Sequence, residues 1–244
     1  MKGTGFLPRI FGHEASGMVE SVGEKVEEVK EGDFVVSVFL PNCGECIDCK
    51  SEKGNMCCRY PTRILPGMRD GTKKACLLSC GVSTGIGASW KVAGVTPGST
   101  VAIFGLGAIG LAEHGGFGEQ MGQAEDLGVG REGMGAGSKE EETEQSDKFE
   151  AEDWGQTIIL GVEMHGSPIP VNSSAILRGK TMKGALFGGL KAKSDIPLLV
   201  KINKDKELHL DEFVTHEVGL RDINKAFDLL LQGKSLRCII WMDK

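Results

Sequence analysis

Residues 41–57 read PNCGECIDCKSEKGNMC and carry four cysteines in the spacing C-x2-C-x2-C-x7-C. Glycines and an asparagine stand between the thiols and favour tight turns. A tetrahedral Zn²⁺ takes four thiolates at about 2.3 Å, and short-spaced cysteines on turns supply them without a large core. The stretch therefore predicts a structural zinc lobe whose ligands are Cys43, Cys46, Cys49 and Cys57.

Two other interpretations of this stretch fit less well. A chance run of cysteines would not show regular spacing together with turn residues. A ferredoxin-type iron–sulfur run closes with x3-C-P, whereas here the last gap is x7 and no proline follows Cys57. Cys58 directly follows Cys57 and is a competitor for the fourth ligand position.

The composition indicates a globular protein with one large or two modest domains, because 40% of its 244 residues are hydrophobic. No stretch approaches the roughly 20 apolar residues of a membrane span. The first fifteen residues hold no continuous apolar segment of the kind found in signal peptides. Without an export signal, the eight cysteines are expected to be reduced thiols or metal ligands, and the expected location is cytoplasmic.

The net charge of −6 is concentrated in one segment. Residues 113–153 hold thirteen acids, three bases and nine glycines, with few apolar groups, which is typical of disorder. The remainder carries a small positive charge without a basic run interleaved with aromatics. This pattern argues against a nucleic-acid partner.

Periodicity and turn residues predict the remaining elements, and no internal repeat is found. We expect β structure over residues 6–40, including the apolar run 33–40, and a helix that starts near Cys80 and ends near Gly94. Further expected elements are strands at 157–164, 177–189 and 236–242, a helix at 194–204 with Pro197 in its first turn, and a helix at 220–235 that Gly233 stops. On this last helix Ile223, Phe227, Leu230 and Leu231 share one face.

A glycine-rich motif follows the expected short buried strand Val101–Phe104. In the G-x-G-x-x-G of residues 105–110, the first glycine allows the tight turn and the second lets the backbone approach a pyrophosphate. The third lets the next helix pack on the strand, and that helix presents its N-terminus to the phosphates. A second strand ending in an acid should follow about twenty residues later. Residues 125–135 contain no β-branched run, so Glu132 is not assigned this role.

His13 and Cys80 are ambiguous on sequence alone. A histidine between strands, as in Gly12-His13-Glu14, is more often a structural residue than a ligand. A single cysteine such as Cys80 is commonly a buried apolar residue.

Taken together, the motifs resemble the zinc-containing alcohol dehydrogenases of the medium-chain dehydrogenase/reductase superfamily, in a plant-like form. The matching segments cover most of the chain outside 113–153. They begin with GHEASGMVESVGEKVEEVKEGDFVV at 12–36 and continue with the four-cysteine stretch and the run 75–112. They end with 155–197 and 223–242.

This resemblance implies an α/β fold made of two parts. Residues 1–80 with 187–244 would form an incomplete GroES-like β-rich catalytic domain, and residues 81–186 a partial Rossmann cofactor domain with a parallel sheet. The implied activity is hydride transfer between an alcohol or aldehyde and NAD, with zinc as a Lewis acid. A glutathione-dependent formaldehyde dehydrogenase is the alternative within the family, and a homodimer is the implied assembly.

The resemblance also assigns roles to individual residues, which reverses the structural interpretation of His13 and Cys80. These two are implied as catalytic zinc ligands with Glu14 beside them, and the four cysteines of the lobe as structural zinc ligands. The implied cofactor-binding residues are Gly105, Leu106, Gly107, Gly110, Leu160, Val162, Phe187 and Arg237.

Three parts of the family pattern have no match in this sequence. The first is a third catalytic cysteine with the Ser/Thr and His that relay the proton. The second is a strand-rich stretch that would lie between Thr72 and Ala75, and the third is the later Rossmann strands, whose place 113–153 takes. We therefore expect a truncated form with one tightly held zinc. The alternative function is a catalytically impaired zinc-binding isoform that associates with full-length subunits.

Overall fold

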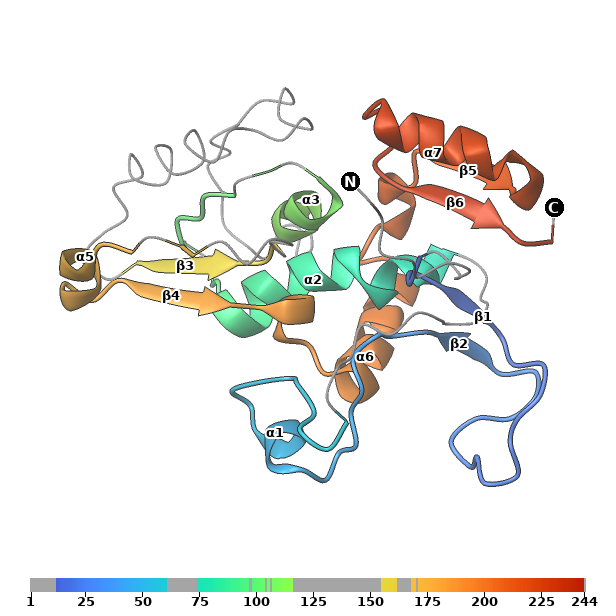
Figure 1. Ribbon diagram of the computed structural model, residues 1–244, viewed down its shortest axis with the longest axis horizontal. Coiled ribbons are helices and arrows are strands. Elements are labelled where there is room, and N and C mark those ends of the chain that lie inside the picture. Colours follow the sequence, from blue (N-terminus) through green and yellow to red (C-terminus); the bar gives the residue numbers. More distant parts are fainter. Residues whose placement is uncertain are drawn as a thin grey trace. The chain divides into compact units, whose positions relative to one another are not determined.

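The computed structural model (Figure 1) describes residues 12–60, 74–96, 98–103, 105, 107–115, 155–161, 168–169 and 171–243. The chain divides into two compact units, a first unit of residues 1–83 with 190–244 and a second unit of residues 84–189. Among the described helices, none has the length and apolar character needed to cross a membrane.

Short strands and helices make up the first unit. Its strands are β1 (Ser16–Met18), β2 (Phe34–Val36), β5 (His216–Gly219) and β6 (Cys238–Trp241). Its helices are α1 (Ile47–Lys50), α6 (Ala192–Lys204) and α7 (Ile223–Leu231), with 3-10 segments at Lys74–Ser79, Leu210–Phe213 and Leu220–Asp222. Helix α2 (Gly81–Gly87) begins in this unit and continues into the second.

The β structure expected over residues 6–40 is confirmed in part. Strands β1 and β2 pair antiparallel, with Ser16 opposite Val36, and the pairing closes where the Ser37 N–H donates to the Ala15 carbonyl at 3.0 Å. The predicted run 33–40 is therefore a strand over only three residues, because a strand extends only as far as its partner does. Residues 6–11 lie outside the described part of the chain.

Helix α7 connects the parallel strands β5 and β6, and this crossover is what parallel pairing requires. The predicted helix and final strand are both confirmed. Gly233 adopts φ +65° and its N–H donates to the Leu230 carbonyl at 3.0 Å, so the predicted stop is also confirmed. Three residues of the predicted apolar face of α7, Phe227, Leu230 and Leu231, are exposed, whereas Ile223 is half-buried.

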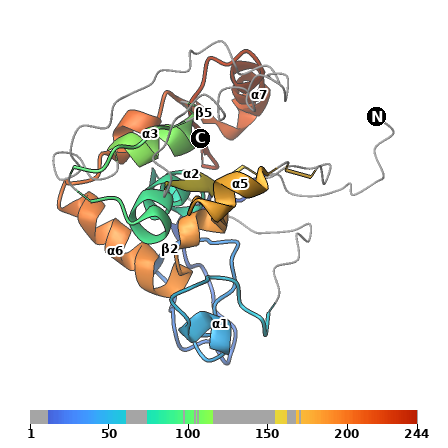
Figure 2. The ribbon, with the colours of Figure 1, turned by 90° about the vertical axis from the view of Figure 1, so that its left-hand side faces the viewer.

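Helix α6 begins earlier than the sequence predicts. Its first residue is Ala192, where the Asp195 carboxylate accepts from the Lys191 N–H at 2.8 Å. Pro197 therefore lies in the second turn and not the first, so that prediction is wrong. Pro197 lies inside α6, which is drawn as one continuous helix (Figure 2), and Ile196 and Leu199 are buried.

A buried hydrogen bond attaches the four-cysteine lobe to the rest of the first unit. The Asn55 side-chain amide donates to the Leu190 carbonyl at 3.0 Å, across 135 positions of sequence. Leu190 is itself fully buried. The buried apolar residues around these elements are Leu40, Leu77, Leu78, Val82, Leu199, Leu208, Leu210 and Phe213.

Among the described residues, the second unit contains a parallel pair of strands and several short helical segments. Strand β3 (Gln156–Ile159) pairs with β4 (Thr181–Gly184), and α5 (Ser173–Leu177) lies between them in the chain. The helical run through Cys80 continues beyond α2 as the π-helical segment Ala88–Ala93, and α3 (Ala108–Gly115) follows. The run ends at Gly94, with φ +64°, as predicted.

Two strand predictions in this unit are corrected. Val101–Ile103 is not a strand, since no described strand pairs with it, and Phe104 lies outside the described residues. The strand predicted as buried over 157–164 is β3, whose first two residues are exposed. The segment predicted to be disordered lies mostly in 116–154, outside the described part of the chain.

A left-handed turn after β4 packs against the end of α2. Phe187 and Gly188 have φ values of +55° and +59°. A Cβ on Gly188 would lie 2.3 Å from the Thr84 carbonyl oxygen and 2.8 Å from the Ala88 nitrogen. Backbone approaches backbone at this point, so only glycine fits.

We predict that Gly188→Ala destabilises the protein by at least about 2 kcal/mol, from left-handed strain and the backbone clash. Gly184→Ala is the matched control, because a Cβ there meets nothing within 4 Å. Urea denaturation of both variants checks the difference. Equal midpoints would show that the turn after β4 does not pack as described.

We predict that Asn55→Ala lowers the free energy of unfolding by about 1–3 kcal/mol, because the Leu190 carbonyl is then buried without its donor. Asn42→Ala is the control, since Asn42 makes an exposed hydrogen bond with the Gly44 N–H in the same lobe. The control should change stability by less than Asn55→Ala in the same denaturation experiment. A larger effect in the control would contradict the role given to Asn55.

Candidate functional site

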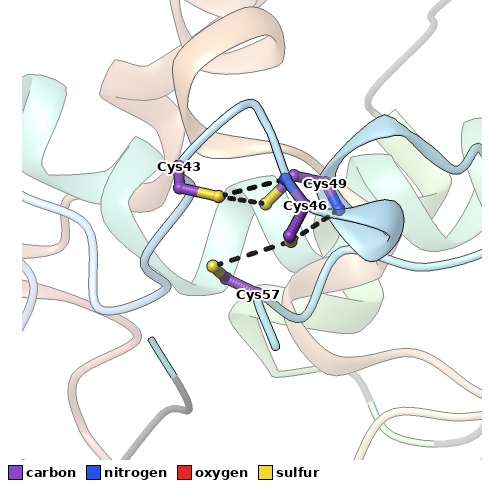
Figure 3. Close-up of side chains that lie close together, drawn as sticks. All are labelled: Cys43, Cys46, Cys49 and Cys57. Atoms are coloured by element: carbon purple, nitrogen blue, oxygen red, sulfur yellow. Dashed lines mark hydrogen bonds between the residues drawn. The ribbon is translucent and has the colours of Figure 1, made fainter. Parts of the chain in front are cut away.

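The four thiols of the lobe converge on one point (Figure 3). Cys43 Sγ lies 3.9 Å from Cys49 Sγ, and Cys46 Sγ lies 3.9 Å from Cys57 Sγ. All four sulfurs lie within 4.8 Å of one another. A tetrahedron with metal–sulfur bonds of about 2.3 Å has edges of about 3.8 Å, so this donor set fits Zn²⁺.

Tight turns around the lobe direct backbone N–H groups at the sulfurs. Cys46 caps the N-terminus of α1, and its Sγ accepts from the Cys49 N–H at 3.4 Å. Cys43 Sγ accepts from the Cys46 N–H at 3.3 Å, and Cys57 Sγ accepts from the Tyr60 N–H at 3.4 Å. Such donors stabilise thiolates and orient them toward a metal.

The thiols differ in their acidity. The N–H of Cys49 lowers the pKa of the Cys46 thiol to about 5, whereas burial raises the pKa of the Cys49 thiol to about 11. The Cys46 thiol therefore loses its proton more readily than the Cys49 thiol. A divalent ion that binds here displaces the remaining protons.

Cys57 and its neighbour Cys58 have different surroundings. Cys57 is 2% exposed and belongs to the four-sulfur group, whereas Cys58 is exposed and lies with Cys46 and Asp48 in a second group. A hydrogen bond with the Asp48 carboxylate raises the pKa of the Cys58 thiol to about 12. Asp48 was not among the residues predicted from sequence, since an acid inside a cysteine run carries no distinctive spacing.

Glu14 is at the centre of a hydrogen-bonded group in the first unit. Its carboxylate accepts from the Arg237 guanidinium, at 3.2 Å from Nε and 3.4 Å from Nη2, and from the Gly81 N–H at 2.9 Å. Gly81 lacks a side chain, and a Cβ there would lie 2.3 Å from Arg237 Nη2. These residues are far apart in the sequence, so no local pattern could have paired them.

His13 and Cys80 each directly precede a member of this group in the sequence, Glu14 and Gly81 respectively. Gly81 follows Cys80 directly, and the His13 ring packs edge-on against Phe39 with centroids 5.4 Å apart. Burial and the nearby Glu14 raise the pKa of the Cys80 thiol to about 11, and they do the same for Cys76. Within the described residues, neither His13 nor Cys80 belongs to a group of three metal-binding side chains.

The glycine-rich segment of the second unit leads directly into α3. Gly105 adopts φ +100°, and a Cβ on Gly110 would lie 1.9 Å from the Gly105 carbonyl oxygen. The space beside Gly107 is open, and its carbonyl accepts the Leu111 N–H at 2.9 Å in the first turn of α3. The turn is tight, open at the second glycine and followed by a helix N-terminus, which fits a dinucleotide.

Two other predicted cofactor residues lie at the carboxyl ends of the parallel strands of the second unit. Leu160 follows β3, and Phe187 lies in the turn after β4 and is 2% exposed. Ligands of open α/β sheets bind at this edge. Arg237 belongs to the first unit and contacts Glu14 there, while Leu106 and Val162 lie outside the described residues.

Comparison with known proteins identifies the family. The model of the alcohol dehydrogenase GroES-like domain matches residues 1–130. Alcohol dehydrogenase-like 1 of Arabidopsis thaliana is 41% identical over 320 aligned positions, covering 98% of this chain and 82% of that protein. Alcohol dehydrogenase 1 of Petunia hybrida is 36% identical, covering 98% of this chain and 84% of that protein.

A solved structure has a similar fold. The crystal structure of benzyl alcohol dehydrogenase from Acinetobacter calcoaceticus superposes with a TM-score of 0.75 at 22% identity, covering 96% of this chain and 84% of that chain. This likeness and the GroES-like match confirm the predicted α/β fold class. The chain belongs to the alcohol dehydrogenase family with a GroES-like domain.

Proposed function

We propose that this chain is a zinc-dependent oxidoreductase that transfers a hydride between an alcohol or aldehyde and NAD. The observation that carries the proposal is the convergence of four thiols at separations suited to tetrahedral zinc, in a member of this family. The open glycine-rich turn supports the choice of a dinucleotide as the second substrate.

Within this proposal, His13 and Cys80 hold the catalytic ion, and the four cysteines of the lobe hold the structural one. Zinc supplies Lewis acidity and NAD accepts the hydride when both are bound. The raised pKa of Cys80 means that this thiol must lose a proton before it can act as a ligand.

Glu14 and Arg237 act as positioning residues in this scheme. The ion pair fixes the start of α2, and with it the backbone that carries Cys80. Both side chains are largely shielded from water. Removal of either one would leave the other as an unpaired, partly buried charge, which lowers the stability of the folded state. Gly105 and Gly107 leave open the space that a pyrophosphate would occupy, and Gly110 lets α3 approach the Gly105 carbonyl.

A second candidate function is that of a catalytically impaired zinc-binding isoform. It is favoured because His13 and Cys80 are joined by no third ligand among the described side chains. The alignments also support the impaired isoform. The alignment with the Arabidopsis protein runs over 320 positions, whereas this chain has 244 residues. The relatives therefore hold segments within the aligned span that have no counterpart here.

We also propose that the chain forms a homodimer or pairs with a full-length family member through β4. All four residues of β4 are exposed, and among the described strands it pairs only with β3. An open strand edge accepts another strand. None of the eight cysteines forms a disulfide, which is consistent with the proposed cytoplasmic location.

We predict one tightly held zinc per purified chain, bound in the four-sulfur site. Cys46→Ser removes a ligand and should abolish tight binding, whereas Cys238→Ser, on β6, should leave it unchanged. Elemental analysis after dialysis against a weak chelator gives the count. Wild-type protein without zinc would contradict the structural site. A second ion that is lost in Cys80→Ala would show that His13 and Cys80 recruit a further ligand such as Glu14 or Cys76.

We predict that zinc-replete protein reduces NAD with a primary alcohol, and that Cys80→Ala lowers kcat/KM at least ~100-fold because a catalytic ligand is lost. Absorbance of reduced cofactor measures turnover across a panel that includes simple alcohols and the glutathione adduct of formaldehyde. The control Cys238→Ser should retain wild-type activity. Folded, zinc-replete protein without turnover would contradict this function and leave the impaired isoform.

A further inference from the structure

One group of potential metal ligands has no part in the proposed reaction and shares only Cys46 with the four-sulfur site. The Sγ atoms of Cys46 and Cys58 and a carboxylate oxygen of Asp48 lie within 4.8 Å of one another. Cys46 and Asp48 come from the cap and the first turn of α1, and Cys58 comes from the segment that closes the lobe. Two sulfurs and one carboxylate oxygen form a donor set suited to a thiophilic divalent cation.

The two adjacent cysteines of the closing segment have opposite exposure. Cys57 is buried in the four-sulfur group, whereas Cys58 is exposed. Cys46 Sγ is close to both of them, 3.9 Å from Cys57 Sγ and within 4.8 Å of Cys58 Sγ. Cys46 is therefore the one sulfur common to both groups.

We propose that Cys46, Asp48 and Cys58 form a second, solvent-open metal site that shares the Cys46 thiolate with the four-sulfur site. A thiolate sulfur keeps lone pairs after it binds one ion, so Cys46 can bridge two. Cys58 loses its thiol proton to solvent when the ion binds, and Asp48 contributes a carboxylate oxygen. Water completes the coordination on the exposed side, so the second ion is held more weakly than the first.

This site rests on the proposed metal occupancy of the lobe, because bridging requires an ion on the other side of Cys46. It is independent of the proposed oxidoreductase activity. A metal count therefore tests it without any measurement of turnover. The probe is Cd²⁺, which is thiophilic and gives a thiolate charge-transfer absorption that reports each ion as it binds.

The experiment titrates the metal-free full chain with Cd²⁺ and counts ions by native mass spectrometry and by charge-transfer absorption. Every protein carries Cys80→Ala, so that ions held with His13 do not enter the count. We expect two ions in the parent and one in Cys58→Ser, with Asp48→Asn weakening the second ion at least ~10-fold. Cys238→Ser is the matched control and should keep both ions.

A magnetic measurement identifies the shared sulfur. With Co²⁺ in place of Cd²⁺, two ions joined by one thiolate couple antiferromagnetically, so the second equivalent should reduce the electron paramagnetic resonance signal per ion. Equal ion counts in the parent and in Cys58→Ser would overturn the proposal. A second Co²⁺ ion that shows no coupling would also overturn it. So would a parent that binds one ion and still binds it in Cys57→Ser, because Cys58 would then be an alternative fourth ligand of the four-sulfur site.

Discussion

The Glu14 carboxylate is the constraint on which the first unit depends. It binds Arg237, 223 positions away, and the Gly81 N–H, 67 positions away. Three segments thus meet at one partly shielded charge: the residues before β1, the start of α2 and the start of β6. Removal of one partner would leave the other charge desolvated, which is why such pairs specify an arrangement more than they add net stability.

Features that depend on a few neighbouring residues could be predicted from the sequence. The four-cysteine spacing predicts the sulfur cluster because turns of fixed length bring the thiols together. Gly94 and Gly233 predict helix ends because the residue after a helix often adopts the left-handed conformation, which favours glycine and requires no distant partner. The packing of the third glycine in the glycine-rich turn also depends on near neighbours, since the close contact between Gly110 and Gly105 lies within six residues of sequence.

Features that depend on a distant partner could not be predicted. The run 33–40 has strand composition throughout, but pairing with β1 limits the strand to three residues. Asp195 moves the start of α6 upstream of the position that Pro197 suggested. The contact of Glu14 with Arg237 and the approach of Asp48 to Cys58 arise from the folded backbone, and neither spacing nor composition encodes them.

The lobe itself contains too little apolar surface to order its own chain. Ile47 is 79% exposed, and the buried side chains within 43–57 are Cys49, Asn55 and Cys57. Its interior therefore consists of sulfur and one amide, so metal binding must supply most of the free energy that orders it. Because Cys46 also caps α1, the ion that fixes this sulfur fixes the helix turn carrying Asp48. In the proposed arrangement, occupation of the four-sulfur site would therefore prepare the neighbouring group, because the two sites share Cys46.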